Sequence, residues 1–498
     1  MGATTDFMVA IELGSTRITG VAGQKNNEGG LTILAYASED ASTCIRKGVI
    51  FNIDKTAGAI TSIINKLEAS LEATIAKVYV GISGQSVRTV KNNVSKHLDD
   101  DTRITSDIVD ELIAINRTSQ NGEMEILEVI PQEYRMGTGL QKDPIGVITN
   151  HIEGRFLNVV ARSSVRRKIE DCFTLAKTKI AGYFIAPIEM ARVVLTDAEF
   201  RSGCALIDFG AETTTVQVYK DHILRHLVVL PLGGNNINKD ICSLKIEEAD
   251  AEELKIKYAS AFTEPQEIDA KPITYTYGAD NSTITDRLLC EITEARMEEI
   301  ITNVWHQITL SEYADKLMAG IIITGGASAT RRLGNAITAK TKIEKIRIAN
   351  YINLEVESVT PELLSRNGRS GTLLGLLYAA RENCCEQEPL KDLFEEETER
   401  LEKETQLEQQ KAEAARIARE KAEQEEAERK AEEERIAREK AEQEEAEREA
   451  ERQRQEEERK AKEEEERRIR RENSLLHKFK EYGKKWVKDI LDDEDEKN

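Results

Sequence analysis

The chain lacks the features that mark several large protein classes. No Cys-x-x-Cys pair occurs and the seven cysteines are odd in number, so we expect reduced thiols and a cytosolic setting. No apolar run approaches the roughly 20 residues of a membrane-spanning helix, and the first residues lack the basic start and apolar core of a signal peptide. A net charge of −21 over 498 residues argues against nucleic-acid binding, which needs a basic surface. The six histidines show no metal-ligand spacing.

Two common nucleotide-binding motifs are also missing, since neither G-x-x-x-x-G-K-[ST] nor G-x-G-x-x-G occurs. Two loops of another design are present, about two hundred residues apart. The first, residues 12–16 (ELGST), follows the apolar run 7–11, and the second, residues 208–213 (DFGAET), follows the apolar run 205–207. Each has an acidic residue at the end of an expected strand, then a glycine and hydroxyl side chains, and then a second apolar strand.

The composition of these loops suits phosphate binding. Glycine lets backbone N–H groups approach phosphate oxygens, and hydroxyl side chains add further donors. The acidic residues Glu12 and Asp208 could hold Mg²⁺ through water, because this ion keeps most of its hydration shell. A third loop, at residues 321–328 (IIITGGAS), opens from a buried strand onto two glycines that a flat adenosine could approach. One loop alone predicts only a turn, whereas two facing hairpins would clamp phosphates from both sides.

Residues 1–385 have globular composition, and the order of expected strands and helices predicts an α/β fold of two lobes around a cleft. Residues 84–162 differ in texture and are interpreted as a small inserted α/β module. The helices expected from apolar spacing and punctuation cover residues 56–74, 106–116, 164–182, 247–260, 284–309 and 371–382, with strands at 78–82 and 156–161. A loop that contains Pro265 and Pro272 is expected between the helices at 247–260 and 284–309.

Several stretches together resemble the FtsA family of actin-like bacterial cell-division proteins. The specific one is VIPQEY at residues 129–134, followed by DPIG at 143–146, because other relatives of actin lack the inserted module. VYVGISGQSV at 78–87, LPLGG at 230–234 and EARMEE at 294–299 also follow the family pattern. The resemblance covers about residues 6–380 and recurs at the C-terminal end of the sequence. It implies an actin-like ATPase fold with lobe 1 beginning in 1–83, the module at 84–162, and the remaining core at 163–385 with an outer subdomain near 240–310.

By this resemblance the cleft binds ATP and Mg²⁺, with Glu12 and Asp208 near the metal ion. The implied nucleotide-binding residues are Gly14, Ser15, Thr16, Asp208, Gly210, Thr213, Gly233, Gly234, Lys255, Gly325 and Gly326. Two positions depart from the family: Glu12 stands where Asp is more usual, and Glu212 would repel a triphosphate unless it faces away. Glu189 lies where actin relatives place a residue that positions the attacking water, although a glutamate on a helix surface is the simpler interpretation. At most slow ATPase activity is expected.

The function that the resemblance implies is a division protein that polymerises on the cytoplasmic face of the inner membrane at the septum. Its partners would be the C-terminal tail of FtsZ, bound near residues 240–310, further copies of itself, an anionic lipid surface and later division proteins. Two alternatives stay open from the residues alone. One is a small-molecule kinase of the same superfold, for which no second substrate signature appears, and the other is a scaffold that binds no nucleotide.

Residues 386–473 consist almost entirely of Glu, Lys, Arg, Ala and Gln, and neither Gly nor Pro occurs between Pro389 and Gly483. Glu-to-Lys/Arg pairs four residues apart favour a single solvated helix, roughly 120 Å long at about 1.5 Å per residue. Within 408–468 the large aliphatics are Ile417 and Ile436, which lie about 100° out of phase, so no coiled-coil seam forms. A weak alanine-rich coiled coil and disorder remain alternatives. The family has a short flexible linker here, so this spacer departs from it.

Residues 474–491 predict an amphipathic helix, which precedes an acidic tail at 492–498. Apolar and aromatic side chains share one face and lysines occupy the other, as in helices that lie in a lipid headgroup region. Docking on the globular part and binding in a partner's groove are the alternatives. The residues expected to bind the membrane are Leu475, Leu476, Phe479, Lys484, Lys485, Trp486, Val487 and Ile490.

Overall fold

The computed structural model describes residues 6–26, 29–118, 123–137, 139–264, 271–349, 353–358, 360, 363 and 368–385. The expected spacer at 386–473, the amphipathic helix at 474–491 and the acidic tail at 492–498 lie outside these residues. Among the described residues, no helix is both long enough and apolar enough to cross a membrane.

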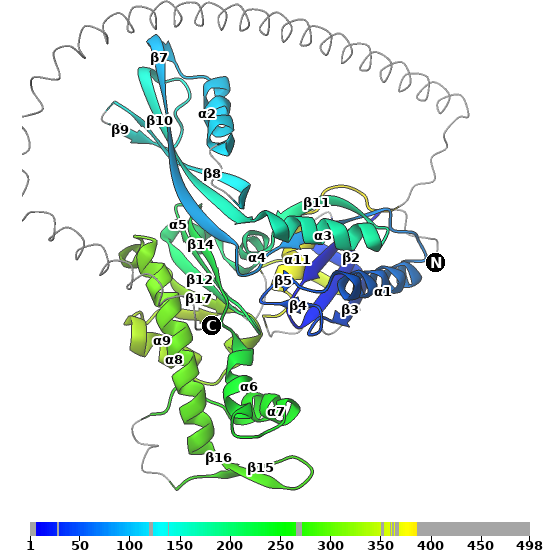
Figure 1. The fold of residues 1–498 in the computed structure, drawn as a ribbon. Coiled ribbons are helices and arrows are strands. Elements are labelled where there is room, and N and C mark those ends of the chain that lie inside the picture. The colour runs from blue at the N-terminus through cyan, green and yellow to red at the C-terminus, as the bar shows by residue number, and fades with distance from the viewer. Residues whose placement is uncertain are drawn as a thin grey trace, which may run out of the picture. The chain divides into compact units, whose positions relative to one another are not determined.

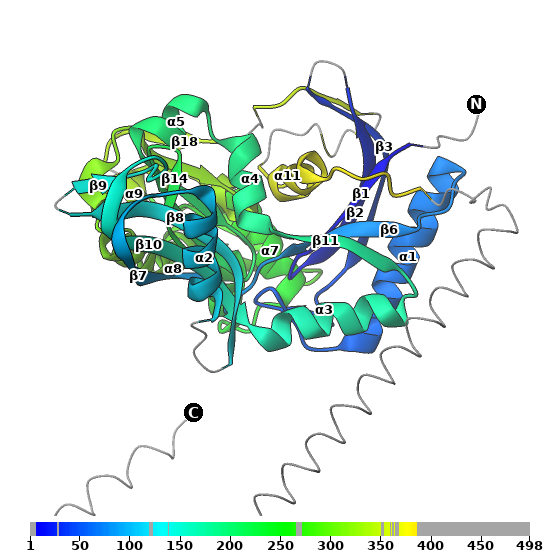
Figure 2. The same cartoon turned by 90° about the horizontal axis from the view of Figure 1, so that it is seen from above.

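The first sheet has the strand order β11-β6-β1-β2-β3-β19. β6 and β1 run parallel, whereas β1, β2 and β3 form an antiparallel meander. Helices α1 and α11 lie on opposite sides of β1 and β2, with α3 beside α1 and α4 beside α11 (Figure 2). The strands are β1 (Met8–Leu13), β2 (Arg17–Lys25), β3 (Leu31–Asp40), β6 (Lys77–Ile82), β11 (Lys179–Ile185) and β19 (Val356–Ser358). The helices are α1 (Ile53–Leu71), α3 (Ser163–Leu175), α4 (Ala186–Val194) and α11 (Gly371–Ala379).

The second sheet repeats this plan. β17 runs parallel to β12, and β12, β13 and β14 form an antiparallel meander. Some of its residues form a core of their own that is rich in Ile, whereas others, such as Leu206, Leu227 and Ile322, belong to the same core as the first sheet. The strands are β12 (Cys204–Phe209), β13 (Thr214–Lys220), β14 (Ile223–Leu230), β17 (Gly320–Thr324) and β18 (Ile346–Ile348). The helices are α5 (Asp197–Ser202), α6 (Gly234–Cys242), α7 (Glu248–Tyr258), α8 (Asp286–Leu310) and α9 (Leu333–Thr341).

The inserted module extends the second sheet beyond β14 in the order β7-β10-β8-β9 and carries α2 on one face (Figure 1). Its own small core contains Leu112 of α2 and the edge-to-face pair Tyr134 and Phe156. The elements are β7 (Arg88–Arg103), α2 (Ser106–Thr118), β8 (Met124–Met136), β9 (Gly139–Gln141) and β10 (Ile148–Arg162). The remaining hairpins are β4 (Ile45–Arg46) with β5 (Val49–Ile50), and β15 (Thr274–Tyr277) with β16 (Ser282–Thr285).

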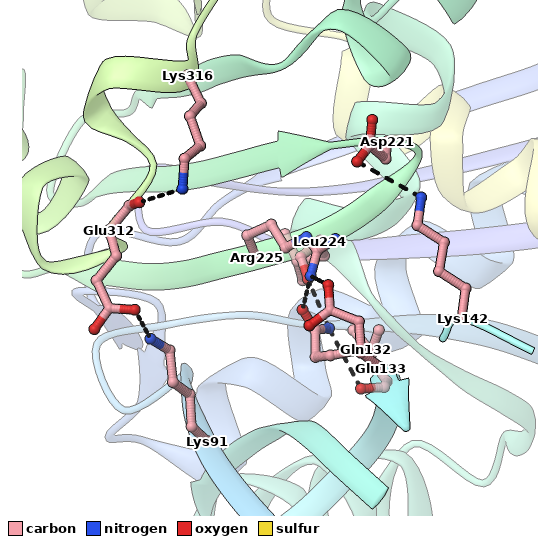
Figure 3. Close-up of polar contacts among 10 residues, drawn as sticks. Lys91, Gln132, Glu133, Lys142, Asp221, Leu224, Arg225, Glu312 and Lys316 are labelled. Atoms are coloured by element: carbon pink, nitrogen blue, oxygen red, sulfur yellow. Dashed lines mark hydrogen bonds and ion pairs between the residues drawn. The ribbon is translucent and has the colours of Figure 1, made fainter. Parts of the chain in front are cut away.

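A β-bulge in β8 fixes the module to the second lobe. Arg155 pairs with Glu133 and the next residue, Phe156, pairs with Pro131, so Gln132 is the extra residue. The bulge lets the consecutive side chains of Gln132 and Glu133 both reach Arg225 of β14, whose Nη1 donates to their oxygens over 3.1 and 2.9 Å (Figure 3).

This contact is largely shielded from solvent. The Arg225 side chain is only 4% exposed, and its guanidinium group lies 5.2 Å from the centre of the Tyr313 ring. Gln132 also donates to the carbonyl oxygen of Leu224 over 3.0 Å. The two flanking ion pairs, Lys91–Glu312 and Lys142–Asp221, are exposed (Figure 3).

Two expectations about local structure were wrong. The helix expected over residues 164–182 ends at Leu175, because Lys177 has a left-handed φ of 56° and β11 then pairs in parallel with β6. The segment between α7 and α8, expected to be a loop, contains the β15–β16 hairpin, and the ring of Tyr275 stacks on that of Tyr258 in α7. Both elements depend on partners distant in the sequence.

The Arg225 contact predicts unequal costs for two substitutions at the module interface. Glu133→Ala leaves a buried guanidinium without its carboxylate, so the opening free energy of β8 and β14 should fall by about 1–3 kcal/mol. Lys142→Ala removes an exposed ion pair and should change it by less than about 0.5 kcal/mol. Native-state hydrogen exchange of the β8 and β14 amides measures both, and equal losses would contradict the role given to Arg225.

Candidate functional site

The two loops that are rich in glycine and hydroxyl residues have the same backbone geometry. In the first, the Gly14 N–H donates to the Arg17 carbonyl over 3.0 Å, and in the second the Gly210 N–H donates to the Thr213 carbonyl over 2.9 Å. A Cβ atom on Gly14 would lie 2.7 Å from the Arg17 oxygen, and one on Gly210 would lie 2.8 Å from the Thr213 oxygen. Each turn therefore requires glycine at its first position.

Both loops border one cavity of about 970 Å³. The sheet plan explains this placement, because each hairpin joins the two central strands of its own lobe, β1–β2 and β12–β13. The predicted residues that line the cavity are Glu12, Gly14, Ser15, Thr16, Asp208, Gly210, Thr213, Gly234, Lys255, Gly325 and Gly326.

Glu12 and Asp208 occupy equivalent positions, each one residue before the end of its strand and opposite a threonine. Burial, and to a lesser extent the charge of Asp208, together raise the pKa of Glu12 to about 7, and a hydrogen bond from Thr19 opposes this shift. Burial raises the pKa of Asp208 to about 6. The two carboxylates thus share a site that disfavours their own negative charge, as expected where a cation or hydrogen-bond donors are to be bound.

The third loop lies against the second. Gly325 has a φ of 87°, and a Cβ atom there would lie 2.2 Å from Asp208 Oδ1 and 2.5 Å from the Phe209 carbonyl oxygen. Thr324, which precedes it, pairs with Asp208 in the parallel β12–β17 ladder. Gly325 thus allows the backbone of the third loop to reach the carboxylate.

Two of the predicted glycines, Gly233 and Gly234, lie at the start of α6 and contact the second hairpin loop. The Gly234 N–H donates to the Gly210 carbonyl over 3.0 Å, and the Asn235 N–H donates to the Ala211 carbonyl over 2.7 Å. These groups at the start of α6 are therefore committed to the loop. Gly233 precedes the helix and is not among the residues that line the cavity, although a Cβ atom there would lie 2.6 Å from the Ala211 oxygen.

Lys255 is held at the cavity wall by a local ion pair. Its Nζ lies 2.5 Å from Glu252 Oε2, and its side chain is 12% exposed. Asn238 of α6 donates to the same carboxylate, and the pKa of Glu252 stays below its usual value because the hydrogen bonds from Lys255 and Asn238 outweigh burial. Lys255 and Glu252 thus present a fixed polar pair to the cavity.

The departure at Glu212 has a local explanation. Its side chain lines the cavity, and its Oε2 accepts a hydrogen bond of 2.6 Å from the backbone N–H of Lys47 in the first lobe. The neighbouring Gly48, which also lines the cavity, donates its N–H to Ser15 Oγ over 2.8 Å. Sequence reasoning missed Lys47 and Gly48, since only a lone glycine marks this turn. It also missed the lining residues Tyr36, Asn238, Glu252, Arg331 and Arg369.

Glu189 lies in α4 but is not among the residues that line the cavity, although its neighbours Ala186 and Pro187 are. The interpretation as a surface glutamate is wrong, because the residue is 6% exposed. Its carboxylate lies 3.0 Å from Arg192, and burial raises its pKa. A catalytic role for Glu189 stays a prediction that this position does not favour.

The residues expected to contact a membrane, from Leu475 to Ile490, lie outside the described residues.

The chain is similar in sequence and in fold to known proteins. The family model "Cell division protein FtsA" matches residues 205–368, and the model "SHS2 domain inserted in FTSA" matches residues 84–160. The FtsA of Porphyromonas gingivalis is 28% identical over 77% of this chain and 80% of its own length. The FtsA of Neisseria meningitidis is 25% identical over 75% of this chain and 90% of its own length.

Among solved structures, the PilM-PilN type IV pilus biogenesis complex is similar at a TM-score of 0.50 and 14% identity. The match covers 75% of this chain and 98% of that chain, and it bears on the fold alone. The predicted actin-like α/β fold with an inserted module is confirmed. On these matches, the chain is similar to the FtsA cell-division proteins over about three quarters of its length.

Proposed function

We propose that the cavity binds ATP with Mg²⁺ and that the protein acts as a polymerising membrane tether for FtsZ filaments. The observation that carries the nucleotide proposal is the convergence of two glycine hairpins of equal geometry on one cavity. Their backbone N–H groups and the hydroxyls of Ser15, Thr16 and Thr213 are donors suited to phosphate oxygens. The cavity of about 970 Å³ is at the upper end of the range for small-molecule sites.

The donor set also fits a hydrated magnesium ion. Glu12 and Asp208 are partly buried carboxylates with raised pKa values, and a bound cation would relieve the electrostatic cost of their negative charge. Mg²⁺ is usually held by one or two carboxylates together with water and substrate phosphates. In this site it would neutralise phosphate charge, while Gly14 and Gly210 hold the loops in place.

The tethering part of the proposal rests on the similarity to FtsA proteins and on the sequence beyond the described residues. Residues 474–491 would lie in the cytoplasmic face of the inner membrane at the septum, and residues 386–473 would separate them from the globular part. The outer subdomain near 240–310 would bind the C-terminal tail of FtsZ, and later division proteins would follow. Since one such helix binds lipid reversibly, polymerisation of the protein would strengthen attachment by multivalency.

The carboxylate pair predicts how nucleotide affinity depends on pH. A carboxyl group attracts a cation only when deprotonated, so Glu12 loses this ability as pH falls through about 7, and Asp208 as pH falls through about 6. Affinity for Mg-ATP should therefore be highest above pH 7 and about tenfold weaker at pH 6. Titration with a fluorescent ATP analogue measures this dependence.

Two variants separate this effect from protonation of ATP itself. Glu12→Gln should remove the part of the pH dependence centred near 7, and Asp208→Asn should lower Mg-ATP affinity by about 10–100-fold. Calorimetry with and without Mg²⁺ tests the metal contribution. Unchanged affinity in Asp208→Asn would contradict the cleft assignment, and turnover stimulated by a sugar would favour a kinase instead.

Co-sedimentation with anionic liposomes tests the tether. The full chain should bind, more strongly with Mg-ATP, whereas residues 1–472 alone should not. Trp486→Glu places a charge on the apolar face and should release the protein, while Trp486→Phe keeps an aromatic ring there and should retain binding. Equal sedimentation of the full and truncated chains would refute the anchor.

A further inference from the structure

The turn between β4 and β5 lies where three parts of the molecule meet. Its two residues, Lys47 and Gly48, both have left-handed backbone conformations, with φ of 51° and 70°. This turn, called here the 47–48 tip, comes from the first lobe but contacts both hairpin loops and the start of the inserted module.

On one side, the 47–48 tip is held by one side chain from each hairpin loop. The Gly48 N–H donates to Ser15 Oγ over 2.8 Å, and the Lys47 N–H donates to Glu212 Oε2 over 2.6 Å. The second bond is charge-assisted and connects the two lobes across the cavity. Two consecutive backbone N–H groups thus bind side chains from two loops that belong to different lobes.

On the other side, the tip touches the root of the module. The Lys47 carbonyl accepts a hydrogen bond from the Gln85 N–H over 3.1 Å. Gly48 packs directly on Gly84, since a Cβ atom on Gly48 would lie 2.6 Å from the Gly84 Cα. Gly84 has a φ of 110°, and three residues later the carbonyl oxygen of Val87 accepts a hydrogen bond from the N–H of Val229 in the second lobe.

We propose that the 47–48 tip couples occupancy of the cavity to the inserted module, with Glu212 as the latch between the lobes. The inference rests on the proposed nucleotide binding. Phosphates bound by the backbone and hydroxyl groups of both hairpins would bring the two loops that carry Ser15 and Glu212 closer together, and the tip is bonded to both residues. The tip meets the module through two glycine backbones, so no flexible side chain is available there to absorb a displacement.

The module has a second attachment, to the second lobe, so the coupling depends on how far apart the two lobes lie. Glu133 and Gln132 bind it to Arg225 of the second lobe, whereas the 47–48 tip belongs to the first. A change in the separation of the lobes therefore shifts the tip relative to a module that stays with β14. The same contact explains why the extra acid at Glu212 belongs in the loop, since it is the group that reaches across to the other lobe.

Hydrogen exchange of the full chain with and without saturating Mg-ATP tests the coupling. The amides of Lys47, Gly48 and Gln85 should exchange about fivefold or more slowly with nucleotide, because the bonds they make are tightened. In Glu212→Ala, measured at a nucleotide concentration that saturates that variant, protection at Gln85 should no longer respond to nucleotide. Glu344→Ala removes an exposed acidic side chain that is not among the residues lining the cavity, and its response should match that of the unchanged protein.

Nucleotide binding is measured separately by fluorescence for each protein. Binding without any change in exchange at Lys47, Gly48 and Gln85 overturns the coupling and leaves the proposed function intact. Absence of binding overturns the proposed function and the coupling with it. If Glu212→Ala fails to fold, as judged by circular dichroism, Glu212→Gln keeps an acceptor without the charge and should show a reduced response. A full response in that variant would show that the charge-assisted latch is not needed.

Discussion

The cavity is built around an electrostatic conflict between two acidic side chains. Glu12 and Asp208 lie next to the last residues of equivalent strands, line one cavity and have raised pKa values because burial penalises their charge. Such an arrangement costs folding free energy above pH 7, where both groups are ionised, so it is expected where binding compensates it. The glycines around the site serve this arrangement. Gly325 in particular reaches Asp208 only because it has no side chain.

The parts of this site that the sequence predicted are the parts that local chemistry determines. A tight turn after a buried strand needs glycine, and the acidic residue that precedes it is visible in the same few residues, so both hairpins could be found. The 47–48 tip could not be predicted, because its contacts join residue 47 to residue 212 and residue 48 to residue 15. The end of α3 was misplaced for a similar reason, since β11 is defined by its parallel pairing with β6.

The contacts of the Pro-Gln-Glu-Tyr stretch give a structural reason for a sequence pattern that is typical of the family. Tyr134 faces the core of the module and packs edge-to-face with Phe156, while the bulge at Gln132 directs two consecutive side chains toward Arg225. A regular strand would place only one of them on that side. One short stretch thus both builds the module and attaches it. Resemblance alone could mark these residues as specific, but it could not say what they contact.

Glu212 illustrates how a single substitution can be accommodated by backbone chemistry. A free carboxylate beside a phosphate loop would repel phosphate. A lysine side chain placed to neutralise that carboxylate could bind the phosphates instead and leave the carboxylate without a partner. The Lys47 N–H binds the carboxylate through a fixed dipole and adds no net charge to the cavity. Because that donor is part of the backbone, its position depends on the shape of the turn rather than on a side chain. The acidity of the second hairpin and the left-handed turn of the first lobe are therefore best understood as one structural feature.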